Sequence, residues 1–311
     1  MQIICGVDIA KDWLDVFASS TGAFGRMANT PEGVAALARF CREAGAGLVV
    51  MEASGGYEQA AFLGLWRAEL PCAVVNALAV RNFAKAMGSL EKTDRIDAQI
   101  IARYAAARRI APTPPASQDQ RKMASLNARM RQITSDLTIQ KQRLASTRDA
   151  ANRAGLAEVI ALFTRQHKAI SKEIAALVDT DPVTQALDRS FRSIKGVSDR
   201  TVATLLAELP EIGTISNKAI AKLAGLAPIA NDSGKRQGRR CIRGGRASVR
   251  SILYLVADVA RRFDQSLADM RNRLLAQGKP KMVVRIALAR KLLVRLNAKA
   301  RDTRNILALA A

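Results

Sequence analysis

The sequence contains a single histidine, His167, among 311 residues. One histidine cannot supply a multi-histidine zinc site or a zinc finger of the two-cysteine, two-histidine type, and it leaves little scope for acid–base catalysis by imidazole. Cys5, Cys41, Cys72 and Cys241 lie far apart without CxxC spacing, so we expect reduced thiols and no thiolate metal site. Any catalysis therefore has to use carboxylates, hydroxyls, amines or thiols.

Aromatic residues and long apolar runs are also scarce. Aromatic side chains make up 4% of the chain, too few for base-stacking platforms such as RRM or OB folds. No run of about 18 apolar residues occurs, and the first residues lack the basic and apolar segments of a signal peptide. We therefore expect a soluble cytoplasmic protein.

Positive charge is what the chain has in excess. It carries 49 Lys and Arg against 27 Asp and Glu, a net charge of +22. The first 100 residues hold 9 basic and 11 acidic residues, net −2, so the remainder carries 40 against 16, net +24. Such a surface attracts phosphates and releases their counterions, so nucleic acid is the expected partner and an anionic membrane the weaker alternative.

The N-terminal part has the pattern of an α/β domain. Short β-prone runs and amphipathic helical runs predict three strands, then helix, strand, helix, strand and helix. These elements are expected over residues 2–8, 13–18, 24–28, 31–44, 47–51, 58–70, 72–75 and 94–109. This is the element order of the ribonuclease H-like fold.

A proline-rich segment, 111–115, cannot continue a helix and marks a boundary. Residues 118–178 are rich in Gln, Arg, Ala and Leu, with Gly155 as the obvious break. That composition predicts two helices, forming a hairpin or a coiled coil that serves as a connector or dimerisation arm.

The C-terminal part is expected to be mainly helical. Gly196 is placed in a tight turn between helical runs, a helix-hairpin-helix pattern whose backbone N–H groups can bind phosphate. A loop rich in Gly and Arg over 231–245 precedes a helix over 246–262. A last basic helix is expected over 281–304.

Four carboxylates lie where a two-metal nuclease needs them. Asp8 is at the end of the first strand, Glu52 follows the buried strand GLVVM, and Asp94 and Asp97 lie three apart near a helix start. Strand-end carboxylates of such a sheet converge, and the spacing of three puts the last two on one helical face. Two Mg²⁺ ions about 4 Å apart can clamp the attacking and leaving oxygens of a phosphoryl displacement.

Each carboxylate taken alone has an ordinary explanation. Asp94, directly after Thr93, can be a helix N-terminal charge favoured by the helix dipole. The case for a metal site rests on four carboxylates appearing in order at the ends of the expected elements. Asp12 and Asp15 are the nearest competitors, and we expect them to face solvent or a turn.

Four segments together resemble a known family. They are GVDIAKDWLDV around Asp8, MEASGGYE around Glu52, EKTDRIDAQIIARYA around Asp94 and Asp97, and GLAPIANDSGKRQGRRCIRGG around Ser233. In this order the sequence resembles the DEDD-type insertion-sequence transposases, also called bridge-RNA-guided recombinases. The resemblance spans nearly the whole chain.

The resemblance implies three parts and a metal site. A RuvC-like domain is expected over residues 1–112, a coiled-coil connector over 113–182 and a serine transposase domain over 183–311. The family's carboxylates bind Mg²⁺, with two ions expected for each active site, and these carboxylates correspond to Asp8, Glu52, Asp94 and Asp97. The family's nucleophilic serine corresponds to Ser233.

The resemblance also implies the partners. Family members act on donor and target DNA with a structured noncoding guide RNA, as homo-oligomers that combine active-site parts from different subunits. A dimer or tetramer is therefore expected, in the bacterial cytoplasm and at the nucleoid when the protein acts, with no membrane partner.

The loop around Ser233 leaves two interpretations open. Ser-Gly is a common turn pair, so the loop by itself favours a turn residue, whereas the resemblance implies a nucleophile. A serine hydroxyl needs activation, and the metal cluster is the natural activator because no histidine is near in sequence. The expected nucleic-acid contacts are Lys235, Arg236, Arg239, Arg240, Arg243, Arg246 and Gly196.

Three functions fit these features. The first is an RNA-guided DNA transposase or recombinase that cuts and rejoins strands through a phosphoserine intermediate. The second is a RuvC-like metal-dependent nuclease or junction resolvase with water as the nucleophile. The third is a non-enzymatic nucleic-acid-binding protein.

Overall fold

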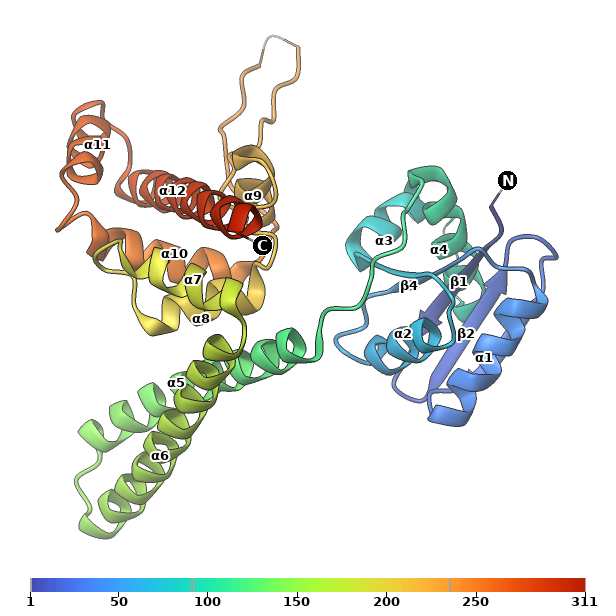
Figure 1. Ribbon diagram of the computed structural model, residues 1–311, viewed down its shortest axis with the longest axis horizontal. Coiled ribbons are helices and arrows are strands. Elements are labelled where there is room, and N and C mark those ends of the chain that lie inside the picture. Colours follow the sequence, from blue (N-terminus) through green and yellow to red (C-terminus); the bar gives the residue numbers. More distant parts are fainter. Residues whose placement is uncertain (1, 90, 92, 235, 311) are drawn as a thin grey trace. The chain divides into compact units, whose positions relative to one another are not determined.

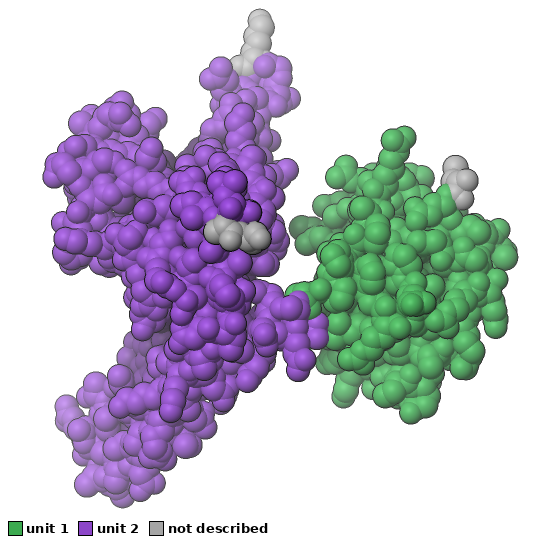
Figure 2. All heavy atoms as spheres, viewed as in Figure 1, with its two compact units in different colours: residues 1–116 green, residues 117–311 purple. Residues whose placement is uncertain are grey.

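The computed structural model describes residues 2–89, 91, 93–234 and 236–310, and the chain folds as two compact units (Figure 2). Unit 1 comprises residues 1–116 and unit 2 residues 117–311. The two-helix segment that was expected as a separate connector belongs to the same compact unit as the C-terminal helices, so the division at residue 182 stays a prediction. No helix in the described ranges is long and apolar enough to span a membrane.

Unit 1 contains a five-stranded mixed sheet (Figure 1). The spatial order is β3-β2-β1-β4-β5, in which β1, β2 and β3 form an antiparallel meander and β4 and β5 run parallel to β1. The strands are β1 (Ile4–Ile9), β2 (Trp13–Ala18), β3 (Phe24–Ala28), β4 (Leu48–Glu52) and β5 (Cys72–Val75). The expected order of strands and helices is found as far as β5, and one unexpected helix, Ala77–Ala86, precedes the helix at residue 94. The meander followed by two parallel strands is the arrangement expected for a ribonuclease H-like fold.

Helices cover both faces of the sheet. α1 (Pro31–Glu43) and α2 (Glu58–Arg67) pack on the face formed by Cys5, Val7 and Val49. α3 (Ala77–Ala86) and α4 (Asp94–Arg108) pack on the opposite face. α3 was not expected from the sequence; it begins after Asn76, whose side chain accepts a hydrogen bond from the backbone N–H of Ala79.

Gly6 sets the distance between β1 and α4. A Cβ atom at Gly6 would lie 2.2 Å from the carbonyl oxygen of Ala98 and 2.6 Å from the backbone nitrogen of Ala102. Such contacts are impossible for any side chain, so only glycine allows the helix backbone to approach this strand so closely. The helix therefore lies at a fixed register over β1, with its first turn next to the carboxylate-bearing end of that strand.

Unit 2 begins with a helical hairpin made of α5 (Gln118–Ser146) and α6 (Ala150–Thr180). The break between the helices lies at residues 147–149, where Asp149 caps α6 by accepting from the N–H of Asn152 at 2.8 Å. The prediction that Gly155 is the break is wrong, because this glycine continues α6. The hairpin itself is as expected, while coiled-coil packing within it stays a prediction.

Six further helices form the C-terminal part of unit 2 and share one apolar core, which includes Phe191, Leu205, Leu253 and Leu292. They are α7 (Pro182–Arg192), α8 (Asp199–Glu208), α9 (Asn217–Leu223), α10 (Ala247–Ala260), α11 (Gln265–Ala276) and α12 (Lys281–Ala310). The sequence analysis did not assign α9 and α11. The expected turn at Gly196 lies between α7 and α8, with a φ of +96°.

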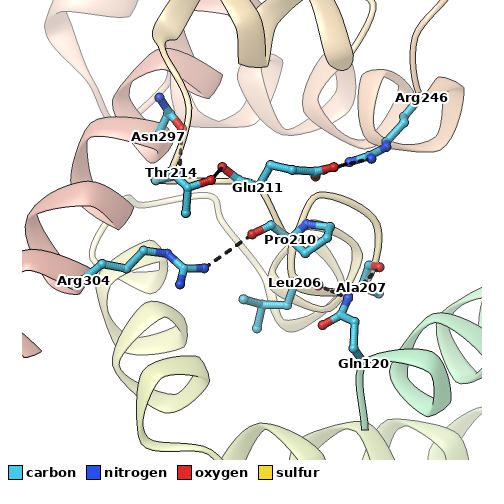
Figure 3. A network of polar contacts seen from close by, with 10 residues as sticks. Gln120, Leu206, Ala207, Pro210, Glu211, Thr214, Arg246, Asn297 and Arg304 are labelled. Atoms are coloured by element: carbon cyan, nitrogen blue, oxygen red, sulfur yellow. Dashed lines mark hydrogen bonds and ion pairs between the residues drawn. The ribbon is translucent and has the colours of Figure 1, made fainter. Parts of the chain in front are cut away.

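Polar contacts from α5 and α12 hold the end of α8 and the segment between α8 and α9 (Figure 3). Gln120 of α5 donates to the carbonyls of Leu206 and Ala207 at 2.8 and 3.0 Å, which satisfies the C-terminal end of α8. Asn297 of α12 accepts from the N–H of Gly213 at 2.8 Å, and Arg304 donates to the carbonyl of Pro210 at 3.4 Å. This segment is therefore a rigid part of unit 2.

Candidate functional site

A row of charged side chains crosses four strands of the sheet in unit 1. Asp8 of β1 lies opposite Asp15 of β2, and Asp15 lies opposite Arg26 of β3. Glu52 ends β4 and has the same strand parity as Leu48 and Val50, which pack on the α4 side of the sheet. All four side chains consequently occupy the face that α4 covers.

Asp15 differs from the expectation that it would face solvent or a turn. It is 3% exposed, and its two carboxylate oxygens accept from Nε and Nη2 of Arg26 at 2.8 and 2.9 Å. The expectation was wrong because antiparallel register places Asp15 directly beside Asp8, under the start of α4. Asp12 is exposed, as expected.

The first turn of α4 brings the other two predicted carboxylates to this row. Thr93 caps the helix by accepting from the N–H of Ile96 at 3.3 Å. Asp94 and Asp97 follow within that first turn, and Asp94 accepts a hydrogen bond from Nη2 of Arg26. Asp94 therefore has both the expected position and an ion pair that the sequence did not reveal.

Electrostatics indicate that the four predicted carboxylates are near one another. The pKa of Asp8 is raised from 3.8 to about 6, first by burial and then by the negative charges of Asp97, Glu52 and Asp94. We call these four residues the carboxylate cluster. The four carboxylates repel one another, and a bound cation would reduce that repulsion.

The donor chemistry of the carboxylate cluster fits a hard divalent cation such as Mg²⁺, which prefers carboxylate oxygens. In the described part of the chain, however, no three acidic, histidine or cysteine side chains are arranged as a ready metal cluster. Asp94 is bonded to Arg26 instead. The residues are thus chemically suited to metal, and one of them has an alternative cationic partner.

Ser233 lies on a loop between α9 and α10, residues 227–246, which we call the basic arm (Figure 1, the orange loop beyond α9). Ile229 forms a bridge with Cys241, and farther out Ser233 and Arg236 exchange backbone hydrogen bonds of 3.0 and 2.9 Å. Gly234 has a φ of +53°, which fits a tight turn. The arm is therefore a hairpin that presents Ser233, an exposed residue, near its tip.

Asp232 braces this hairpin. Its carboxylate accepts from the N–H of Gly238 at 3.1 Å and from Nη2 of Arg240 at 2.7 Å. Asp232 has no role that is evident from the sequence alone, and in the structure it cross-links the two sides of the arm next to Ser233.

The predicted nucleic-acid contacts are not equally placed. Arg236, Arg239, Arg240 and Arg243 are exposed on the basic arm, and Lys235 lies outside the described residues. Arg246, at the base of the arm, donates to both carboxylate oxygens of Glu211 at 2.5 and 2.6 Å (Figure 3). Arg246 therefore anchors the arm to the rigid segment between α8 and α9.

Gly196, His167 and the three buried cysteines occupy positions that are explained by packing. A Cβ atom at Gly196 would lie 3.1 Å from the backbone of Ala260, so glycine is needed for packing against α10 as well as for the turn. His167 lies half-buried on α6, beside a 290 Å³ cavity between the hairpin and α8. All four cysteines, which belong to the described residues, are thiols.

Two segments of the chain match models of transposase families. Residues 5–151 match the model of the DEDD transposases of the IS110 group, described as a transposase. Residues 188–271 match the model described as the transposase IS116/IS110/IS902 family. The first segment contains the carboxylate cluster, and the second contains Ser233 with α8, α9, α10 and parts of α7 and α11.

Two curated proteins are similar over most of their length. The pilin gene-inverting protein of Moraxella bovis is 25% identical over 324 residues, covering 96% of each chain. The protein of the same name from Moraxella lacunata is 25% identical over 275 residues, covering 82% of this chain and 80% of its own. Among solved structures, Thermus thermophilus RuvC covers 36% of this chain at 14% identity with a TM-score of 0.26.

Proposed function

Since the chain carries both transposase domains of the IS110 family, we propose that it is a DNA recombinase that cuts and rejoins strands through Ser233. The observation that carries the proposal is the gathering of Asp8, Glu52, Asp94 and Asp97 at one end of the sheet in unit 1. The names of the two Moraxella relatives favour inversion of a DNA segment, which is one outcome of strand exchange between two sites.

The carboxylate cluster is proposed to hold Mg²⁺, with two ions for each active site. A divalent cation at this position supplies charge neutralisation for a phosphate under attack and lowers the pKa of an attacking hydroxyl. The protein's own contribution is to hold four oxygen donors on a rigid sheet and helix. The pKa of Asp8 is raised first by burial and then by the three neighbouring carboxylates, and a bound cation would offset both effects.

Ser233 is proposed as the nucleophile. Its Oγ attacks a DNA phosphorus, forming a phosphodiester bond to the protein and breaking the bond to one DNA oxygen, which leaves as a hydroxyl after taking up a proton. A hydroxyl from a second strand then attacks the phosphoserine, and the Ser233 hydroxyl is regenerated. No water is consumed and the number of phosphodiester bonds is unchanged, so the reaction needs no high-energy cofactor.

The exposed arginines of the basic arm fit contacts with the DNA backbone. Guanidinium groups bind phosphate in a bidentate manner and balance charge that develops at phosphorus. Few aromatic residues are present to read bases, which suits a protein whose sequence choice is delegated to pairing with a guide RNA. We propose such an RNA, donor and target DNA, and further copies of this chain in a dimer or tetramer as the partners.

A covalent intermediate provides the test. The full chain is incubated with copurified RNA, Mg²⁺ and end-labelled donor and target DNA, then denatured and resolved by electrophoresis. We expect a labelled protein–DNA adduct with the wild type and with Ser251→Ala, an exposed serine on α10, and none with Ser233→Ala. Cleavage without any adduct would indicate hydrolysis by water and would overturn the proposal.

A further inference from the structure

Arg26 is the one positively charged side chain in the row that it forms with Asp8, Asp15 and Glu52. Two members of this row, Asp8 and Glu52, belong to the carboxylate cluster. It lies on β3, at the edge of the sheet, and both oxygens of the buried Asp15 accept from its guanidinium at 2.8 and 2.9 Å. A bidentate pair of this kind fixes the plane and position of the guanidinium. The ring of Trp13, 5.7 Å from the Arg26 guanidinium carbon, adds a cation–π contact.

The same guanidinium also bonds a member of the carboxylate cluster. Nη2 of Arg26, which donates to Asp15, donates to Asp94 as well. The Asp15 side chain is 4% exposed, whereas that of Asp94 is 60% exposed. Arg26 thus joins a buried carboxylate of the sheet to an exposed carboxylate of α4, and the two bonds differ in how easily they break.

The charges explain why a cation is needed here. Asp8 and Asp15 are like charges directly opposite each other on neighbouring strands, an arrangement that is destabilising by itself. A buried carboxylate such as Asp15 requires a charged partner. Arg26 meets that requirement and still reaches Asp94 with the same nitrogen.

We propose that Arg26 is a resident counter-cation of the carboxylate cluster, which holds Asp94 before metal binds and releases it when a divalent cation enters. Asp15 is the anchor that keeps Arg26 beside the cluster throughout. Arg26 and Asp15 are positioning residues in this account. The inference rests on the proposed function, because it assumes that the carboxylate cluster is the metal site.

The direction of the effect follows from competition. A divalent cation has to displace Arg26 from Asp94, and an exposed ion pair opposes this by a factor of up to about five in an equilibrium constant. Removing Arg26 alone would leave buried Asp15 unpaired and endanger the fold. Replacing both residues by neutral ones of similar shape keeps the net charge and frees Asp94.

Binding of Mn²⁺ to the full chain without DNA tests the proposal, with free Mn²⁺ measured by electron paramagnetic resonance. The informative variant is Asp15→Asn/Arg26→Gln, and Arg26→Gln is measured beside it. The control is Arg95→Gln, because Arg95 is also on α4 next to Asp94 but stacks over the ring of Phe24. Asp8→Asn/Asp97→Asn shows which binding belongs to the carboxylate cluster.

We expect the Kd for Mn²⁺ to fall about two- to fivefold in the double variant and to change less than twofold in the Arg95 control. Binding by the double variant but not by the wild type would support the proposal more strongly. An unchanged or higher Kd in the double variant, or an equal fall in the control, overturns it while leaving the metal site intact. Absence of binding in all variants, or binding that survives Asp8→Asn/Asp97→Asn, overturns this inference and the proposed metal site together.

Discussion

The two regions that carry the proposed chemistry are built in opposite ways. The carboxylate cluster lies on a sheet under α4, and Gly6 fixes the helix at backbone contact distance. Ser233 lies exposed near the tip of a hairpin whose outer part is held by one backbone pair and by the bonds of Asp232 to the N–H of Gly238 and to Arg240. The proposed metal ligands are thus positioned by the fold, whereas the proposed nucleophile is exposed at the surface.

Charge follows the same division. Unit 1 holds 12 basic and 11 acidic residues, and unit 2 holds 37 basic and 16 acidic residues. Under the proposed function, unit 2 supplies the attraction for DNA, while the carboxylates of unit 1 would need a cation before a phosphate approaches. Binding and chemistry should be separable by mutation along this division.

The largest expected effect separates the two units. Asp8→Asn or Asp97→Asn should lower strand exchange at least about 100-fold, since metal assistance is worth several kcal/mol, and should leave DNA affinity within twofold. Asp12→Asn, an exposed carboxylate beside the same strands, is the matched control and should retain activity. Rates from recombination assays and affinities from gel shifts decide the matter, and a parallel loss of DNA binding would contradict the division.

Glycine substitutions should affect the two units with opposite signs. Gly6→Ala should destabilise unit 1 by about 1–3 kcal/mol, because its Cβ collides with the backbone of α4. Gly155→Ala, inside α6 with open space around it, should stabilise the hairpin by up to about 1 kcal/mol.

Tryptophan fluorescence makes this measurement specific to one unit. The two tryptophans, Trp13 and Trp66, both belong to unit 1, so denaturant curves followed by their emission report on that unit. Circular dichroism, dominated by helices, follows unit 2. An unchanged fluorescence midpoint for Gly6→Ala would show that α4 does not depend on close contact with β1.

The stability of unit 1 should depend on pH through Asp8. Because the pKa of Asp8 is raised to about 6 in the folded chain, the folded state takes up a proton before the unfolded state does as the pH falls. The Asp8 contribution to the free energy of unfolding should therefore increase as the pH is lowered from about 6 toward 4. Denaturant curves without metal should show this trend for the wild type and lose it for Asp8→Asn, whereas an identical slope in both would contradict the shift.

The smallest effects are expected on the basic arm. Arg239→Gln and Arg243→Gln should each reduce the slope of log affinity against log salt by about 1, as expected for one lost phosphate contact. Arg246→Gln should leave the slope unchanged and lower the stability of unit 2, because Arg246 is bonded to Glu211. If Arg246→Gln changed the salt slope and the Arg239 and Arg243 variants did not, Arg246 would be the phosphate contact and the other two would not.

Much of the fold follows from local pattern. Strand alternation and helix starts placed β2, β3 and β5 at their observed bounds, and the helix that carries Asp94 began where Thr93 provides a cap. α3, α9 and α11 were missed because short helices carry little periodic signal. The prediction of a helix break at Gly155 was wrong because this glycine is tolerated inside a long helix. The helix begins instead after its cap, Asp149.

The candidate site was predictable in its members and not in their partners. Strand ends and a three-residue spacing suffice to select the four carboxylates. The pairing of Asp15 with Arg26 depends on the register of three strands, and the burial of Asp15 depends on the helix that lies above it. Likewise, Arg246 and the exposed arginines of the basic arm look the same in sequence, because Glu211, the partner of Arg246, is distant along the chain.

If Ser233 becomes covalently joined to DNA, the modification lies on a single tryptic peptide. Trypsin releases residues 223–235 as a peptide, LAGLAPIANDSGK, in which Ser233 is the sole hydroxyl-bearing residue. After reaction with DNA, denaturation and nuclease digestion, mass spectrometry should find this peptide carrying a nucleotide. A nucleotide on another peptide, or on none while strand exchange proceeds, would contradict the account.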